Sequence, residues 1–183
     1  MASLCGDDEL VFHVRRVPDG RVSSYVFDEL KPGDTVRVSG PLGTACLRTR
    51  HEGPMLCVAG GTGLAPILSI LRGAIDAGMQ NPIHLYFGVR SPQDVYGLDE
   101  LKALQAAHAD LKLHIVVTTD EQGSGLRTGL VTEAIAQDLS NVDGWRAYVC
   151  GAPPMVEATA ALLKLRGIAP QYCYADAFYA SGT

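Results

Sequence analysis

With 183 residues, the chain is long for one small domain and short for two full domains, so we expect one complete domain and a partial one. Hydrophobic residues make up 47% of the sequence and charged residues 19%, which is typical of a soluble globular protein with a substantial core. The formal net charge of −5 and the lack of any basic run argue against a nucleic-acid-binding surface.

The sequence carries no signal for a membrane or for export. No apolar stretch approaches the ~20 residues that a membrane helix needs, and the N-terminus lacks the basic and apolar regions of a signal peptide. We therefore expect a cytoplasmic protein.

The cysteines predict neither disulfides nor a metal site in this chain. Their number is odd, and their spacing matches neither metal ligands nor the C-x4-C-x2-C signature of a plant-type iron–sulfur cluster. They are Cys5, Cys46, Cys57, Cys150 and Cys173.

The first 50 residues predict part of an antiparallel β-barrel. Residues 9–17 alternate apolar and polar side chains, as a barrel strand does, and residues 35–41 form a second run that ends at Gly40-Pro41. Two strands are too few to close a barrel. We therefore assign residues 1–50 to a partial barrel domain.

Between these two strands, the sequence predicts a turn and a short helix. Pro18-Asp19-Gly20 is a typical turn, and residues 25–30 are helical, with Ser23 as the N-cap. A helix start beside Arg21 and two hydroxyl groups suits a phosphate, but it is equally typical of a capped surface helix. The residues alone do not decide between these two interpretations.

A short central stretch predicts a nucleotide-binding turn. Residues 55–59 are a continuous apolar run of the parallel-sheet type, and residues 64–77 carry apolar side chains with the period of a helix. Between them, Gly60-Gly61-Thr62-Gly63 allows a tight turn, whose N–H groups and following helix N-terminus suit a pyrophosphate. The alternative is an ordinary strand-to-helix turn in which glycine only provides a positive φ.

Two standard motifs do not account for this turn. A P-loop ends in Gly-Lys-Ser/Thr, and no lysine lies near, whereas the dinucleotide fingerprint G-x-G-x-x-G requires glycine where Pro66 stands. The strand predicted over residues 83–89 also lacks an acidic residue at its end to bind a ribose hydroxyl. The turn therefore indicates another type of nucleotide site.

From residue 54 onward, apolar strands alternate with helices. This alternation predicts an α/β domain over residues 54–183, built on a five-stranded, doubly wound parallel sheet. Right-handed crossovers place the ligand at the carboxyl ends of the strands. The strands are expected at residues 55–59, 83–89, 112–118, 145–150 and 171–175, and the helices at residues 64–77, 98–107, 130–139 and 153–165.

Three motifs, in this order, resemble the ferredoxin-NADP reductase family: Gly60-Gly61-Thr62-Gly63-Leu64-Ala65-Pro66, Tyr86-Phe87-Gly88-Val89-Arg90 and Cys150-Gly151-Ala152-Pro153-Pro154-Met155. The resemblance covers essentially the whole chain and is greatest to the oxygenase-reductase branch. Members of that branch pass electrons from NADH through FAD and an iron–sulfur centre to aromatic-ring dioxygenases or monooxygenases. The resemblance implies a flavin-binding barrel before the α/β domain and a role in aromatic hydrocarbon catabolism.

The resemblance also implies a binding site for NADH. The glycine turn and the segment after the fourth strand hold the nucleotide, and the loop after the second strand contacts the adenosine ribose. An arginine in that loop also suits the 2′-phosphate of NADPH, although the branch more often uses NADH. The implied residues are Gly60, Gly61, Thr62, Gly63, Leu64, Pro66, Arg90, Asp94, Cys150, Gly151, Pro153 and Met155.

Three further residues are implied at the hydride-transfer centre. Cys150 positions the nicotinamide against the flavin, Asp176 assists proton handling near flavin N5, and Phe178 shields the flavin ring. Without the resemblance, Cys150 is equally well a buried small side chain, and the two C-terminal residues equally well have no role. The segment that matches the family's FAD pyrophosphate site is Gly20, Arg21, Val22 and Ser23.

The family's flavin signature, Arg-x-Tyr-Ser, does not occur in this sequence, and Met1 to Leu4 resembles the segment that follows it. We therefore expect a C-terminal fragment without half of the flavin barrel, and an iron–sulfur cluster only in a longer parent or a partner. The first hypothesis is an oxidoreductase module that passes electrons from NADH through FAD to a ferredoxin or iron–sulfur domain and an oxygenase. The second is a nucleotide-binding module that does not hold FAD. A third is a docking domain with an empty crevice.

Overall fold

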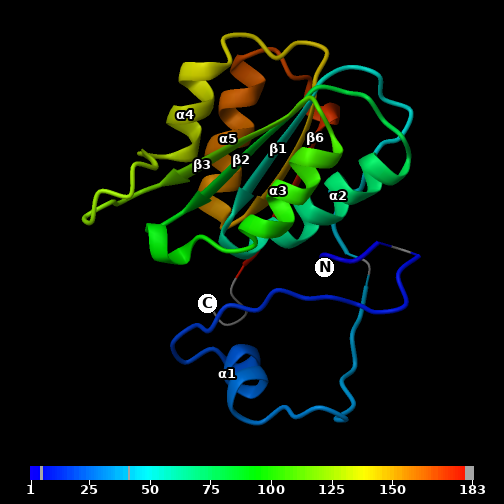
Figure 1. Cartoon of the computed structure of the whole chain (residues 1–183), viewed down its shortest axis with the longest axis vertical. Coiled ribbons are helices and arrows are strands. Elements are labelled where there is room, and N and C mark those ends of the chain that lie inside the picture. Colours follow the sequence, from blue (N-terminus) through cyan, green and yellow to red (C-terminus); the bar gives the residue numbers. More distant parts are fainter. Residues whose placement is uncertain (5, 41, 180–183) are drawn as a thin grey trace.

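The computed structural model describes residues 1–4, 6–40 and 42–179. Cys5, and Pro41 at the end of the second predicted strand, lie outside the described residues. The described part divides into an α/β domain and an N-terminal segment that surrounds one short helix (Figure 1).

The α/β domain is built on a parallel sheet with the strand order β4-β3-β2-β1-β5-β6. The prediction of a doubly wound parallel sheet is confirmed, because β1 pairs with β2 on one side and with β5 on the other. A sixth strand, β4, was not predicted; it has two residues and pairs only with the end of β3. The strands are β1 (Met55–Gly60), β2 (Ile83–Val89), β3 (Leu111–Val117), β4 (Arg127–Thr128), β5 (Arg146–Gly151) and β6 (Cys173–Ala177).

Four helices cover the two faces of this sheet (Figure 1). Side chains of α2 and α3 belong to one buried cluster and those of α4 and α5 to the other, so each face has its own core. The apolar run of β1 serves both, since alternate side chains of a strand point to opposite faces: Cys57 packs on the α2 side and Val58 on the α5 side. The helices are α2 (Leu64–Asp76), α3 (Leu98–Ala107), α4 (Val131–Asp138) and α5 (Pro153–Leu165).

The two barrel strands predicted in the N-terminal segment are wrong. Within residues 1–4, 6–40 and 42–54 the structure contains no β-strand; the Ala2 N–H donates to the Val11 carbonyl oxygen at 2.8 Å, but the predicted strands form no β-ladder. Their apolar side chains have no facing layer to pack against: Phe12 is 46% exposed, Val36 51% and Val38 53%. A period of two defines a face, but a strand also needs a hydrogen-bonded neighbour.

The N-terminal helix begins earlier than predicted. α1 spans Arg21–Asp28 with Gly20 at its N-cap, so the prediction of Ser23 as the N-cap is wrong. Ser23 instead lies in the first turn, where its hydroxyl accepts a hydrogen bond from the Val17 N–H at 3.1 Å. The same hydroxyl lies 3.2 Å from the Gly20 carbonyl oxygen, to which it donates. The side chain therefore ties the helix start to the preceding turn.

Two structural features are absent from the described residues. No helix among them has the length and apolar character needed to cross a membrane. In the same residues, no group of three His, Cys, Asp or Glu side chains is placed to hold a metal ion.

A stack of aromatic rings lies on the α4 side of the sheet. The ring centroids of His84 and His114 are 5.6 Å apart, those of Tyr86 and His114 4.3 Å, and those of His84 and Trp145 5.4 Å. Burial lowers the pKa of His84 to about 4, with the nearby charge of Lys112 acting in the same direction. The imidazole of His84 is therefore neutral in the folded protein at neutral pH.

Acidification from pH 6.5 to pH 5 is expected to destabilise the fold. In this range the unfolded chain binds a proton at His84, whose ordinary pKa is 6.5, while the folded chain does not. The free energy of unfolding therefore falls as the pH falls, by about 1–3 kcal/mol. Urea denaturation at pH 7.5, 6.5 and 5.0 measures the change. His84→Phe keeps a stacked ring without a titrating nitrogen, so an equal loss in this variant contradicts the assignment.

Candidate functional site

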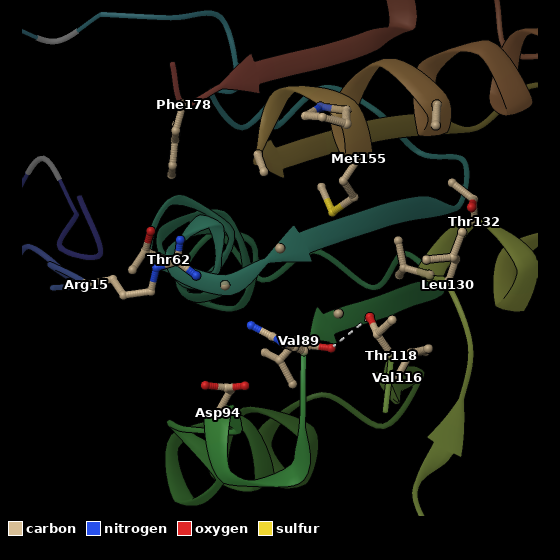
Figure 2. A pocket seen from close by; sticks show the side chains of 18 of the residues that line it. Arg15, Thr62, Val89, Asp94, Val116, Thr118, Leu130, Thr132, Met155 and Phe178 are labelled. Carbon is tan, nitrogen blue, oxygen red and sulfur yellow. Dashed lines mark hydrogen bonds between the residues drawn. The ribbon is translucent and has the colours of Figure 1, made fainter. Parts of the chain in front are cut away.

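A cavity of about 1040 Å³ opens at the carboxyl ends of the central strands. It lies where the strand order reverses around β1, which is the place where doubly wound sheets bind ligands. Its wall combines the glycine turn, the loop after β2, the starts of α4 and α5, the C-terminal segment and part of the N-terminal segment (Figure 2). Among the predicted residues, those that line it are Gly60, Gly61, Thr62, Arg90, Asp94, Met155 and Phe178.

The glycine turn combines an open side and a packed side. Gly61 has a φ of 52°, in the left-handed region, and nothing lies within 4 Å of where a Cβ would stand. Gly63 has an ordinary φ of −59°, but a Cβ there would overlap the carbonyl group of Cys150. One glycine thus leaves space on the exposed side of the turn, and the other lets the turn pack directly on β5. The turn leads straight into α2, whose N-terminus favours a negatively charged group.

The end of β5 packs against the end of β1 with almost no intervening side chains. Gly151 has a φ of 150°, and a Cβ there would lie 2.9 Å from the Gly60 carbonyl oxygen. Met155 reaches from the first turn of α5 toward β1, and its sulfur would lie 2.6 Å from a Cβ at Gly60 (Figure 2). Pro153 opens α5 but is not part of the cavity wall, unlike Ala152 and Pro154.

Cys150 lies behind the cavity wall. Its side chain is fully buried in the core on the α2 side, and its backbone carbonyl group packs against Gly63 of the glycine turn. Burial raises the pKa of the thiol to about 12, and the facing carboxylate of Asp176 acts in the same direction. At neutral pH the group is a protonated thiol, which excludes a thiolate nucleophile at this position.

Asp176 lies near the end of the edge strand β6, and Phe178 follows directly after that strand. Asp176 pairs with Cys150 across β5 and β6, and its carboxylate accepts a hydrogen bond from the Thr44 N–H at 2.9 Å. Phe178 donates its N–H to the Gly151 carbonyl oxygen at 2.8 Å, and its ring lines the cavity (Figure 2). The C-terminal segment therefore connects the N-terminal segment to the cavity.

The loop after β2 presents two opposite charges to the cavity, Arg90 and Asp94. The carboxylate of Asp94 is fixed by Ser91, which donates its N–H at 3.0 Å and its hydroxyl at 2.8 Å. Opposite this loop, the hydroxyl of Thr118 donates to the Val89 carbonyl oxygen at 3.5 Å (Figure 2). The carboxylate has no salt bridge within the described residues, so its charge is available to a ligand.

Several predicted residues lie elsewhere. Leu64 is buried in the core beneath the turn, and neither it nor Pro66 of α2 is among the lining residues. The segment Gly20, Arg21, Val22 and Ser23 also lies outside this cavity; a smaller one of about 490 Å³ is lined by the neighbouring Arg16–Asp19 and by Ser24.

Sequence reasoning missed the contribution of the N-terminal segment. His13, Val14 and Arg15 line the cavity, and Figure 2 shows Arg15 reaching toward the glycine turn. Tyr96, after the β2 loop, completes this side of the wall. The start of α4 was also missed, including Thr132. No local pattern marks these residues, because their contacts join segments that are distant in sequence.

Comparison with known proteins places this geometry in a family. Residues 57–161, more than half of the chain, match the sequence profile of the oxidoreductase NAD-binding domain. The chain belongs to the oxidoreductase NAD-binding domain family. Residues 3–46 match a second profile, that of the oxidoreductase FAD-binding domain.

Curated relatives of this NAD-binding domain protein are reductase components. It is 60% identical over 182 residues to the ferredoxin–NAD(P)(+) reductase component of the naphthalene 1,2-dioxygenase/salicylate 5-hydroxylase systems of Ralstonia sp. It is 55% identical to the corresponding component of the naphthalene 1,2-dioxygenase system of Pseudomonas putida. Both alignments cover 100% of this chain and 56% of the relative, so the chain spans about half the length of these proteins.

Solved structures agree with this assignment. The Amycolatopsis cytochrome P450 reductase GcoB superposes with a TM-score of 0.84 at 34% identity, over 90% of this chain and 50% of that one. The ferredoxin reductase in carbazole 1,9a-dioxygenase gives a TM-score of 0.75 at 27% identity, over 91% of this chain and 50% of that one. The fold of this NAD-binding domain is therefore of the ferredoxin reductase type.

The residues of the cavity fit a nicotinamide dinucleotide. The open side of Gly61 leaves room for a pyrophosphate at the start of α2, and the fixed carboxylate of Asp94 suits a ribose hydroxyl. For FAD the fit is partial: Phe178 and Arg15 face the cavity, but the Gly20 to Ser23 segment stays outside it.

Proposed function

We propose that the chain is the nicotinamide-nucleotide-binding part of an oxidoreductase that takes electrons from NADH through FAD to an iron–sulfur acceptor of an oxygenase system. The observation that carries the proposal is the cavity itself, with a glycine turn at the point where the strand order reverses. The reductase names of the relatives that are 60% and 55% identical support the same conclusion.

Different residues of the cavity bind different parts of the nucleotide. The N–H groups of Gly61 and Thr62 and the start of α2 hold the pyrophosphate, and Asp94 accepts a hydrogen bond from a ribose hydroxyl. Met155 and Phe178 shape the opposite end, where the nicotinamide lies, and exclude water from it. When bound, NADH supplies the hydride and FAD accepts it, which is the chemistry of the cofactors. The protein provides position and shielding.

Cys150 and Asp176 act indirectly, through the backbone next to the end of the cavity where the nicotinamide binds. The buried, protonated thiol fixes the backbone at Cys150 and Gly151, and this backbone in turn packs on the glycine turn. Asp176 joins the Thr44 backbone to β6, so it holds the segment that would carry the flavin near the cavity. In this role Cys150 positions the nicotinamide and is not a nucleophile.

We infer that NADH is preferred to NADPH. Two hydrogen bonds from Ser91 fix the carboxylate of Asp94 in the loop after β2. Its negative charge would repel a 2′-phosphate bound beside it. Arg90 lies in the same loop and lines the cavity, and it packs along the adenosine. The names of the relatives, which print NAD(P)(+), leave both nucleotides open.

The proposal extends to domains, partners and location. Residues 1–50 form part of the FAD-binding domain and residues 54–183 the NAD(P)H-binding domain, in line with the two matching profiles. The electron acceptor is a ferredoxin or an iron–sulfur domain, which serves an oxygenase of aromatic hydrocarbon catabolism in the cytoplasm. The dioxygenase systems in the names of the relatives support this choice of partner.

A second candidate function is supported by the N-terminal segment. Residues 1–4, 6–40 and 42–54 form no strand, and they leave Phe12 and Val38 about half exposed. The described chain therefore lacks a preformed surface that could bind the flavin. In that case the chain binds the nicotinamide nucleotide but does not hold FAD and does not turn over.

The visible spectrum of the purified chain separates the two functions. FAD is added, unbound flavin is removed, and NADH is then added without oxygen. Retained flavin that NADH bleaches is expected for the reductase. A colourless protein that still binds NADH supports the nucleotide-binding module, and a protein that binds neither cofactor contradicts both.

Replacing Cys150 by alanine in the FAD-loaded protein is expected to slow flavin reduction about tenfold while leaving NADH affinity nearly unchanged. The thiol does not touch the cavity, so its loss disturbs the nicotinamide only through the Gly151 backbone. Stopped-flow absorbance measures the rate. Cys57→Ala removes a second thiol from the same core and serves as the control. Equal rates in the wild type and Cys150→Ala contradict the positioning role.

A further inference from the structure

Three groups form a hydrogen-bonded chain from the N-terminal segment to the glycine turn. The Nδ1 atom of His13 lies 3.0 Å from the hydroxyl oxygen of Tyr96. That hydroxyl lies 3.3 Å from the carbonyl oxygen of Gly61, and all three residues line the cavity. The rings of His13 and Tyr96 meet edge to face at 5.3 Å, and Phe87 packs against Tyr96 at 5.7 Å. The tyrosine ring is thus held between the N-terminal segment and the α/β domain.

The hydroxyl of Tyr96 has one hydrogen and two neighbours that can accept it. When Nδ1 of His13 carries no proton, it is an acceptor and lies closer than the Gly61 carbonyl, at 3.0 Å against 3.3 Å. The hydrogen then points to His13. When Nδ1 carries a proton, it donates to the tyrosine oxygen, and the hydrogen of Tyr96 is released toward Gly61. The two arrangements exclude each other because only one hydrogen is available.

We propose that His13 and Tyr96 are positioning residues for the glycine turn, and that protonation of His13 turns the Tyr96 hydroxyl onto the Gly61 carbonyl and fixes the turn. Gly61 is the residue on which such a contact has most effect, because it lies in the left-handed region and no side chain packs on its open side. We call this hydrogen-bonded chain from His13 through Tyr96 to Gly61 the link. Because His13 belongs to the N-terminal segment, the link makes the conformation of the glycine turn depend on that segment.

The charges around His13 set the pH range of this link. Burial in the cavity wall lowers the pKa of His13 below 6.5; the carboxylate of Glu100 on α3 raises it, and the α-amino group of Met1 lowers it. Arg15, two residues along the same segment, and the charged residues Arg90 and Asp94 of the β2 loop line the same cavity. His13 is therefore neutral at pH 7.5, and the hydrogen moves to Gly61 as the solution becomes acidic.

The consequence for ligands rests on the proposed function. If the turn holds the pyrophosphate, the protonated link increases the affinity for the nucleotide. The expected gain on full protonation of His13 is about threefold to tenfold, the effect of one additional ordinary hydrogen bond. A positive charge on His13 also attracts the nucleotide directly, so the two contributions have to be separated.

The link is tested first in the free chain, by NMR of protein labelled with ¹³C at the glycine carbonyls and ¹⁵N at the histidines. We expect the Gly61 carbonyl shift to titrate with the midpoint of His13, and Nδ1 to be unprotonated at pH 7.5. Tyr96→Phe and His13→Gln should each leave the Gly61 shift constant with pH. Tyr172→Phe, a partly exposed tyrosine outside the cavity wall, is the matched control and should titrate as the wild type does.

Two results overturn the proposal: a Gly61 shift that stays constant while His13 titrates, or one that still titrates in Tyr96→Phe. A neutral ring with its proton on Nδ1 at pH 7.5 overturns it as well. Circular dichroism at each pH confirms that the variants remain folded.

Calorimetric titration with NAD⁺ at pH 7.5 and at a pH below the His13 midpoint found by NMR then measures the consequence. In Tyr96→Phe the direct attraction of the charge remains but the link is lost, so most of the pH-dependent gain in affinity should disappear. A gain that is unchanged in Tyr96→Phe contradicts the positioning role. Lack of NAD⁺ binding at either pH, together with the expected NMR titration, contradicts the proposed function and leaves the link supported.

Discussion

Replacement of Gly63 by alanine is expected to weaken NADH binding about tenfold or more and to lower the free energy of unfolding by about 3 kcal/mol or more. The backbone at Gly63 has a φ of −59°, which suits alanine, so the effect comes from collision alone. The added Cβ would overlap the carbonyl group of Cys150 and lie 2.8 Å from the nitrogen of Gly151. These are backbone atoms of a strand paired on both sides, and they have no room to retreat.

Two other glycines separate collision from backbone strain. Gly78 has a φ of 67° with nothing within 4 Å of a Cβ, and it lies outside the cavity, so Gly78→Ala should cost about 1 kcal/mol of stability and leave NADH binding unchanged. Gly61→Ala carries similar strain but places its methyl group in the cavity, and should lower affinity more than stability. Urea denaturation and calorimetry measure both quantities. A Gly63→Ala protein as stable as Gly78→Ala contradicts the packing described for the turn.

Asp94→Asn is expected to shift the preference between NADPH and NADH toward NADPH by about tenfold or more. Asparagine keeps the shape of the side chain, and its amide oxygen, in place of the one carboxylate oxygen that Ser91 contacts, accepts from both the N–H and the hydroxyl of Ser91. Only the negative charge is lost. Since tenfold in affinity corresponds to about 1.4 kcal/mol, removing one repulsive contact with a 2′-phosphate is sufficient.

The ratio of the two dissociation constants is the quantity to measure, by calorimetry at one ionic strength. Asp99→Asn removes a charge of the same sign from the exposed first turn of α3, outside the cavity wall, and should leave the ratio unchanged. An unchanged ratio in Asp94→Asn contradicts the placement of the ribose beside this carboxylate. A loss of NADPH binding in Arg90→Ala would assign the 2′-phosphate to Arg90 instead.

The sheet could be predicted because its signals are local. Each long strand is an apolar run between breakers, and each helix repeats its apolar residues with the helical period, so the alternation alone predicts a doubly wound parallel sheet. β4 could not be predicted, because Arg127 and Thr128 are polar and become a strand only by pairing with Val116 and Val117. The barrel strands fail for the converse reason. Their alternation is clear, but no neighbouring strand forms a β-ladder with them in the described residues.

The site could be predicted only where one stretch of sequence makes it. The glycine turn is such a stretch, and the structure places it on the cavity wall. The motif predicts that Cys150 lies at the end of a strand, but it does not predict where the side chain points. In the structure the side chain lies in the same buried cluster as Tyr148, away from the cavity. His13 and Tyr96 are 83 residues apart, so their contact is a product of the fold and has no signal in either segment.

The most direct test of the account is a calorimetric titration of the purified chain with NADH, in parallel with NADPH and with Gly63→Ala. We expect one binding site, weaker binding of NADPH and a large loss of affinity in the variant, since the glycine turn and Asp94 form the site. A wild-type chain that shows a native circular dichroism spectrum but binds neither nucleotide would contradict it.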